Sequence, residues 1–163
     1  MATRQDEFER IAMPHSRSLL RVACRLTSDA AEAEDLVQET LLLAWRNFRQ
    51  FRSGTNARAW LFRILLNAFY AHGRKCRTPQ ATFASTAETE VWPEPVSVSS
   101  AADTEDVARA LAALHLEHRT VLLLGVVEGF TCREIAEMLS IPIGTVMSRL
   151  NRARQAIARP SDT

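Results

Sequence analysis

The chain has 163 residues, of which 47% are hydrophobic, and a formal net charge of +1 at pH 7, which is ordinary for a globular protein of one domain or two small ones. No apolar run approaches the ~20 residues needed to cross a bilayer, and the opening MATRQDEFERI is charged where a signal peptide would be apolar, so we expect a cytoplasmic protein without membrane insertion. Three widely separated cysteines make no disulfide framework, which excludes a small cross-linked secreted fold.

The first part of the chain has the apolar spacing of helices. Apolar side chains recur every three or four residues, and Pro14 marks a boundary or a first helical turn. Asp29 can cap a following helix, and residues 53–56, Ser-Gly-Thr-Asn, have the chemistry of a loop. Only five glycines interrupt the chain, so we predict an all-α fold. The expected helices cover about residues 8–26, 30–48 and 57–74.

Charge is segregated within this part of the chain. Residues 29–39 carry five acids and no base, whereas residues 40–87 carry eight bases and no acid. Glu32, Asp35 and Glu39 fall on one helix face, where like charges cost roughly a few tenths of a kcal/mol per pair. The pattern predicts one acidic and one basic surface on the same small domain, with an ordinary solvated helix face as the alternative.

The composition changes after residue 78. Residues 79–102 contain three prolines, three acids and no base, and they lack helical periodicity, which is typical of a flexible linker. Helical spacing resumes at Asp103. We therefore predict two small helical domains, residues 1–78 and 103–163, joined by this linker.

Residues 131–157 have the layout of a helix, a tight turn and a second helix. Thr131 can cap the first helix, Pro142 interrupts the pattern, and the second helix is expected to begin near Gly144. Residues 144–159 hold four arginines and no acid, which favours an anionic partner. The arrangement predicts a DNA-reading helix-turn-helix, and a three-helix bundle with a basic rim is the alternative.

Three segments carry a resemblance to a known family: AEDLVQETLLLAW (33–45), GTNARAWLFRILLNAFY (54–70) and EGFTCREIAEMLSIPIGTVMSRLNRAR (128–154). In this order the chain resembles, over nearly its whole length, the extracytoplasmic-function (ECF) sigma factors of the sigma-70 family. The resemblance implies a region 2 helical bundle that binds the clamp helices of the large subunit of core RNA polymerase and opens the promoter at the minus-10 element. It implies a region 4 helix-turn-helix that reads the minus-35 element of promoter DNA. Contact with the polymerase flap, a stress or envelope response and control by an anti-sigma factor follow from the same resemblance.

The resemblance also implies roles for individual residues. The polymerase-binding residues are Glu32, Asp35, Gln38 and Glu39. The minus-10 residues, around a loop at 53–56 that resembles the family's site for a flipped base, are Arg52, Asn56, Arg58, Arg63, Asn67, Arg74, Lys75 and Arg77. The minus-35 residues are Arg133, Thr145, Ser148, Arg149, Arg152 and Arg154. Met147 departs from the family, since many members carry a basic residue there.

No set of residues indicates an enzyme or a cofactor. The sequence has no glycine-rich phosphate loop, no nucleophile elbow and no framed carboxylate pair. His72 and Cys76 lie four residues apart, but two ligands do not make a metal site. We expect Trp60 and Phe62 to lie in the core rather than on a surface that stacks on bases.

Two other functions fit parts of the sequence. An autonomous helix-turn-helix regulator would act as a dimer, but no segment resembles a dimerisation helix and the acidic helix would have no role. A sigma mimic that sequesters an anti-sigma factor would have no need of the arginine-rich helix. A sigma factor accounts for both the acidic and the basic surfaces.

Overall fold

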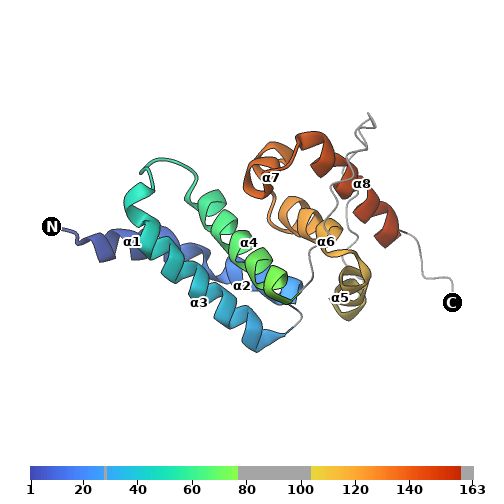
Figure 1. The fold of residues 1–163 in the computed structure, drawn as a ribbon, viewed down its shortest axis with the longest axis horizontal. Helices are drawn as coiled ribbons and strands as arrows, with labels where there is room; N and C mark the ends of the chain where they lie inside the picture. Colours follow the sequence, from blue (N-terminus) through green and yellow to red (C-terminus); the bar gives the residue numbers. More distant parts are fainter. Residues whose placement is uncertain (28, 77–103, 159–163) are drawn as a thin grey trace. The chain divides into compact units, whose positions relative to one another are not determined.

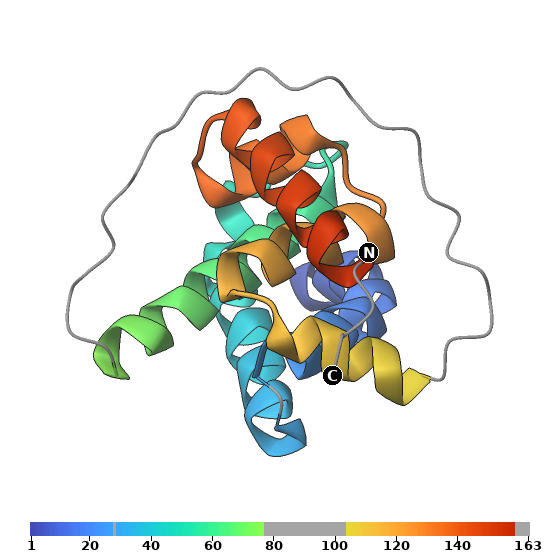
Figure 2. The ribbon, with the colours of Figure 1, turned by 90° about the vertical axis from the view of Figure 1, so that its right-hand side faces the viewer.

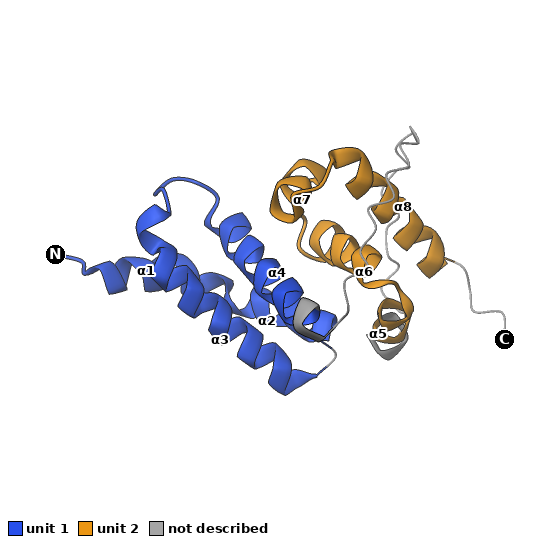
Figure 3. Ribbon diagram, viewed as in Figure 1, with its two compact units in different colours: residues 1–82 blue, residues 83–163 orange. Residues whose placement is uncertain are grey.

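The computed structural model describes residues 1–27, 29–76 and 104–158. It divides into two compact units, Met1–Thr82 and Phe83–Thr163, shown in separate colours in Figure 3. Within the described residues both units contain helices and no β-strand, which confirms the predicted all-α class (Figure 1; Figure 2). The predicted linker, residues 79–102, lies outside the described residues.

Within its described residues, unit 1 consists of four α-helices and two short 3-10 turns. Pro14 lies in the first of these turns, which separates two helices where the sequence allowed a boundary. Asp29 caps the helix that follows it, because its carboxylate accepts a hydrogen bond from the N–H of Ala31 at 2.8 Å. The elements are α1 (Arg4–Ala12), the turn Met13–His15, α2 (Ser16–Thr27), α3 (Ala30–Asn47), the turn Phe48–Gln50 and α4 (Ala57–Cys76).

The core of unit 1 lies where α2, α3 and α4 pack on one another. Phe62 is fully buried, as predicted, while Trp60 is half-buried and its ring lies 4.8 Å from that of Phe51. Phe8 of α1 closes one end of the core, with ring centroids 5.3 Å from both Trp45 and Phe48 in edge-to-face geometry. This packing holds α3 and α4 together and leaves their outer faces to solvent.

The described part of unit 2 contains four α-helices and one π-helical segment. The last helix packs on α6 and α7 through Val146, Leu150 and Ala153, which are all buried. Arg119 ties the start of this unit together, because its guanidinium donates to the backbone carbonyls of Leu111, Ala112 and Leu114. The elements are α5 (Thr104–Ala113), α6 (Leu116–Leu122), the π-helix Leu123–Val127, α7 (Cys132–Leu139) and α8 (Ile143–Ala158).

Helices α7 and α8 form the expected helix-turn-helix. Thr131 caps α7 in a reciprocal pair with Glu134: the hydroxyl of Thr131 accepts from the N–H of Glu134 at 3.2 Å, and the glutamate accepts from the N–H of Thr131 at 2.8 Å. The helix ends at Ser140, whose φ of 54° lies in the left-handed region. Helix α8 begins at Ile143, one residue before the expected Gly144.

Candidate functional site

The predicted polymerase-binding residues lie on the outer side of α3. Glu32, Asp35 and Gln38 are exposed. Glu39 differs, because its side chain is 41% exposed and its carboxylate lies 2.5 Å from Nε2 of His72 on α4. Glu39 therefore joins the two helices as well as contributing to the acidic face.

Leu42 is a surface residue of α3 that the sequence reading missed. Its side chain is 50% exposed, which is unusual for a leucine in the middle of an 18-residue helix. It lies four residues after Gln38 and seven after Asp35, so the three share one side of the helix. That spacing was the available signal, and it places an apolar group inside the polar face.

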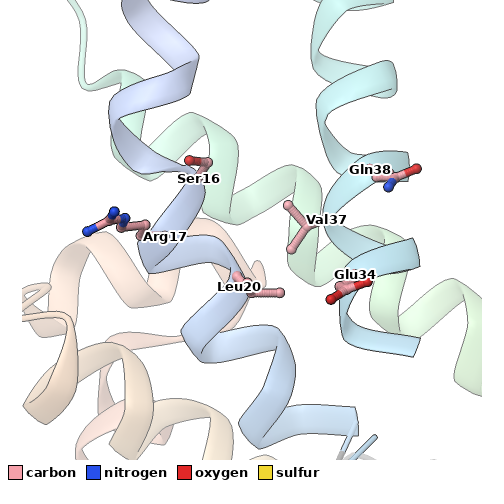
Figure 4. A pocket seen from close by; sticks show the side chains of 6 residues that line it. All are labelled: Ser16, Arg17, Leu20, Glu34, Val37 and Gln38. Carbon is pink, nitrogen blue, oxygen red and sulfur yellow. The ribbon is translucent and has the colours of Figure 1, made fainter. Parts of the chain in front are cut away.

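An open hollow of about 230 Å³ lies between α2 and α3 (Figure 4). Leu20 and Val37 contribute apolar side chains to it, one from each helix. Arg17 and Gln38 lie at its rim on opposite helices. Gln38, a predicted polymerase-binding residue, therefore borders a concave surface rather than a flat one.

The loop before α4 is held by its own polar side chains. Gly54 adopts φ of 90°, which favours glycine. The side-chain oxygen of Asn56 accepts from the N–H of Ala59 at 3.0 Å and so caps α4. The hydroxyl of Thr55 donates to the carbonyl of Arg52 at 2.7 Å. Asn56, predicted to contact DNA, thus also has a structural role.

The other predicted minus-10 residues lie on α4 or close to one of its ends in the sequence. Arg52, Arg63 and Asn67 are exposed, and the last two lie one helical turn apart on the same side. Arg58 is half-buried, with its guanidinium carbon 5.7 Å from the ring centroid of Phe62. Arg74 and Lys75 lie in the last turn of α4, but their side chains are outside the described part of the structure. Arg77 lies outside the described residues.

Five of the predicted minus-35 residues lie on α8, and Arg133 lies on α7. Arg152 and Arg133 are exposed, whereas Thr145, Ser148 and Arg154 are half-buried. Arg149 has only 19% of its side chain exposed, and its Nη2 lies 3.3 Å from Oε2 of Glu117 on α6. The sequence reading did not foresee this ion pair.

Two titratable side chains of unit 2 lie close to arginines of α8. Burial lowers the pKa of His118 on α6, and the charges of His115, Arg152 and Arg149 lower it further, against the opposing effect of Glu117. Near α7, burial raises the pKa of the Cys132 thiol, and the charge of Arg154 acts in the opposite direction. Burial is the main cause of both shifts, and the arginines of α8 add smaller electrostatic effects.

The structure brings together no metal centre among the residues that it describes. His72 contacts Glu39, and the side chain of Cys76, its predicted neighbour on α4, lies outside the described set. No helix of the described chain is long and apolar enough to cross a membrane. The candidate site thus consists of one acidic face in unit 1 and basic surfaces in both units.

Both halves of the chain match families of known proteins. Residues 11–78 match Sigma-70 region 2, and residues 104–157 match Sigma-70 region 4. The chain is 40% identical over 147 residues to the ECF RNA polymerase sigma factor SigL of Mycobacterium tuberculosis, covering 88% of this chain and 82% of SigL. This chain belongs to the ECF sigma factors. A second ECF sigma factor, EcfG of Rhodopseudomonas palustris, is 35% identical, over 86% of this chain and 77% of EcfG.

Solved structures have the same fold as this chain. The sigma factor RpoE of Bartonella quintana, solved in complex with the anti-sigma factor NepR, has a TM-score of 0.73 and 30% identity, over 93% of this chain and 94% of that one. CnrH, solved in complex with the cytosolic domain of CnrY, has a TM-score of 0.69 over 96% and 88% of the two chains. At 23% identity, CnrH supports the fold alone.

Proposed function

We propose that this ECF sigma factor divides its work between surfaces of opposite charge. It binds core RNA polymerase through the exposed face of α3, opens promoter DNA at the minus-10 element through the loop at 53–56 and α4, and reads the minus-35 element through α8. Region 2 occupies residues 1–78 and region 4 residues 103–163 in this proposal. The observation that carries it is the occurrence of both sigma regions, in order, on helices with these charges.

The α3 face has the properties of a docking surface for a basic partner. Asp35 and Glu32 are exposed and close together, so each raises the electrostatic energy of the other in the free chain. The clamp helices of the polymerase large subunit would relieve this repulsion with basic side chains and so gain both affinity and association rate. Leu42 adds an exposed apolar group at the C-terminal end of this row of polar residues, and a hollow lies beside Gln38.

The surface around the start of α4 suits a single DNA strand. Arg52 and Arg63 are exposed and can contact phosphates, while the loop before the helix can receive an unstacked base. Asn56 caps α4 through its side-chain oxygen, which fixes this residue at the place where the loop meets the helix. Strand capture at this place would stabilise the opened promoter.

Helix α8 suits the major groove of duplex DNA. Thr145 and Ser148 lie near its start, where small polar side chains can reach base edges, and Arg152 is exposed for phosphate. Each unit alone makes few contacts, so binding to both promoter elements depends on the polymerase holding the two units at once.

Our proposals for how this chain is regulated and where it acts draw on its relatives. RpoE was solved with an anti-sigma factor, and we propose that an anti-sigma factor likewise restrains this chain by covering its charged surfaces, as part of a stress or envelope response. We further propose that the chain acts in the cytoplasm, beside the polymerase, and that it has no catalytic activity of its own. The autonomous regulator and the sigma mimic are less favoured, because neither uses all the surfaces described above.

Size-exclusion chromatography with purified core polymerase tests the first step. We expect the chain to co-elute with core polymerase at low salt and to separate from it as the ionic strength rises, since the contact is largely between charges. Separate elution at low salt would contradict the proposal. Bovine serum albumin in place of the polymerase is a control for non-specific association.

A further inference from the structure

We propose that Met147, with Ile143 one turn before it, forms an apolar contact that reads the 5-methyl group of thymine in the minus-35 element. The inference rests on the proposed function of α8 as the helix that enters the major groove. It assigns a specificity-determining role to two exposed apolar side chains near the start of this helix.

Both side chains are apolar and yet exposed to solvent. Ile143 is 44% exposed and Met147 is 38% exposed, although Val146 and Leu150 of the same helix are buried. A separation of four residues places Ile143 and Met147 on one side of α8, a single turn apart. They lie in the first five residues of the helix.

The charge around this apolar pair identifies what covers it. Residues 144–159 contain four arginines and no acid, so the partner of this helix carries negative charge. A nucleic acid duplex satisfies the arginines through its phosphates, and the thymine methyl is the apolar group that its major groove presents. A protein that covered this pair would need acidic and apolar groups together, and the experiment below distinguishes that case from DNA.

Methionine suits this contact in physical terms. Its side chain is unbranched and polarisable, so it can adjust to a methyl group without a fixed shape around it. Ile143 has no hydrogen-bonding group, and the Met147 sulfur is only a weak acceptor, so neither side chain favours the amino group of a cytosine strongly. Removal from water of one methyl group corresponds to roughly a fourfold change in the dissociation constant.

Deoxyuridine substitution isolates this methyl group. The probe is the minus-35 duplex of a promoter selected by the holoenzyme from a library, with each thymine on either strand replaced singly by deoxyuridine. We expect the wild-type holoenzyme to bind one or two of these duplexes about fourfold more weakly. Met147→Ala should bind the thymine duplex more weakly by a similar factor and should no longer distinguish it from the deoxyuridine duplex.

Matched variants keep the test specific. Met147→Leu retains an apolar side chain and should keep the discrimination, whereas Met147→Lys should lose it. Met13→Ala removes an exposed methionine from unit 1 and should leave minus-35 binding unchanged. Because Met147 is exposed, these changes should not unfold unit 2, which circular dichroism can check.

Four results would overturn the inference. Equal binding of all the deoxyuridine duplexes by the wild type would show that no methyl group is read. Full discrimination by Met147→Ala would assign the reading to another residue, and weaker binding of Met147→Ala to a protein partner alone would make the pair a protein contact. A holoenzyme that assembles but does not distinguish minus-35 sequences at all would overturn the proposed function of α8 as well.

Discussion

Arg149 and Glu117 connect the middle of α8 to the first turn of α6. The two side chains approach to 3.3 Å, and 19% of the arginine but 59% of the glutamate is exposed. A guanidinium has five N–H donors in a planar fork, so one carboxylate contact leaves others for a phosphate. The contact therefore orients an arginine that we propose to bind DNA.

Substituting Arg149 and Glu117 one at a time separates the orienting role of their ion pair from DNA binding by Arg149. Arg149→Ala should weaken minus-35 binding by about 1.5–3 kcal/mol, the range for a charge-assisted hydrogen bond. Glu117→Gln should change the free energy of unfolding by less than about 1 kcal/mol, because the glutamate is exposed, and should leave DNA affinity equal or higher, since a negative charge is removed. Fluorescence anisotropy of the holoenzyme with a labelled duplex measures the DNA affinity of each variant. Equal losses in the two variants would show that Arg149 serves only to join the helices.

Asp35 and Glu39 should differ in their effect on polymerase binding. Asp35→Arg should weaken binding to core polymerase by roughly tenfold or more, since it places like charges together at the contact. Glu39→Gln should have a smaller effect, because Glu39 is partly engaged with His72. Glu9→Arg, a charge reversal at an exposed acid of α1, is the matched control and should bind normally. Undiminished binding of Asp35→Arg would remove the assignment of this face.

Asn56 combines a helix cap with a proposed contact to an unstacked base. Asn56→Ala should destabilise unit 1 by about 1 kcal/mol through loss of the cap, whereas Asn56→Ser keeps a capping oxygen and should stay close to the wild type. Both variants should reduce promoter opening, measured by permanganate reactivity of thymines in the opened strand, because both lose the amide NH₂ group. Normal opening by Asn56→Ser would limit Asn56 to its role as a cap.

The stability of unit 2 should depend on pH through His118. Burial holds its folded pKa below the ordinary value of 6.5. As the pH falls below 6.5, His118 binds a proton in the unfolded chain but stays neutral in the folded unit until the lower folded pKa is reached. The free energy of unfolding should therefore decrease as the pH falls from 6.5 to the folded pKa. His118→Gln should flatten this decrease in urea unfolding between pH 7.5 and 5. An unchanged slope in the variant would contradict the account. His15, whose pKa is lowered mainly by burial and then by the charge of Arg58, should give a separate decrease in unit 1.

Much of the fold could be predicted from local sequence. The α3 and α4 helices were foreseen from apolar spacing, and Thr131 and Asp29 were foreseen as caps because capping depends on residues close in sequence. The start of α8 was placed one residue late, since Ile143 directly follows Pro142 and local spacing alone does not locate the first helical turn.

Less of the site could be predicted, because its contacts join distant parts of the chain. Glu39 meets His72, and Arg149 meets Glu117, only after the helices have packed. The sequence indicated the charges of these residues but not their partners, which depend on the rotation of each helix about its axis. The exposure of Met147 likewise follows from how α8 is seated on α6 and α7.

Run-off transcription with core polymerase and a promoter library tests most directly the claim that opposite charges divide the work of this sigma factor. We predict that the wild type produces transcripts with defined start sites, that Asp35→Arg and Arg149→Glu each abolish them, and that Glu9→Arg does not. Identical start sites and transcript amounts with and without the chain would contradict the account.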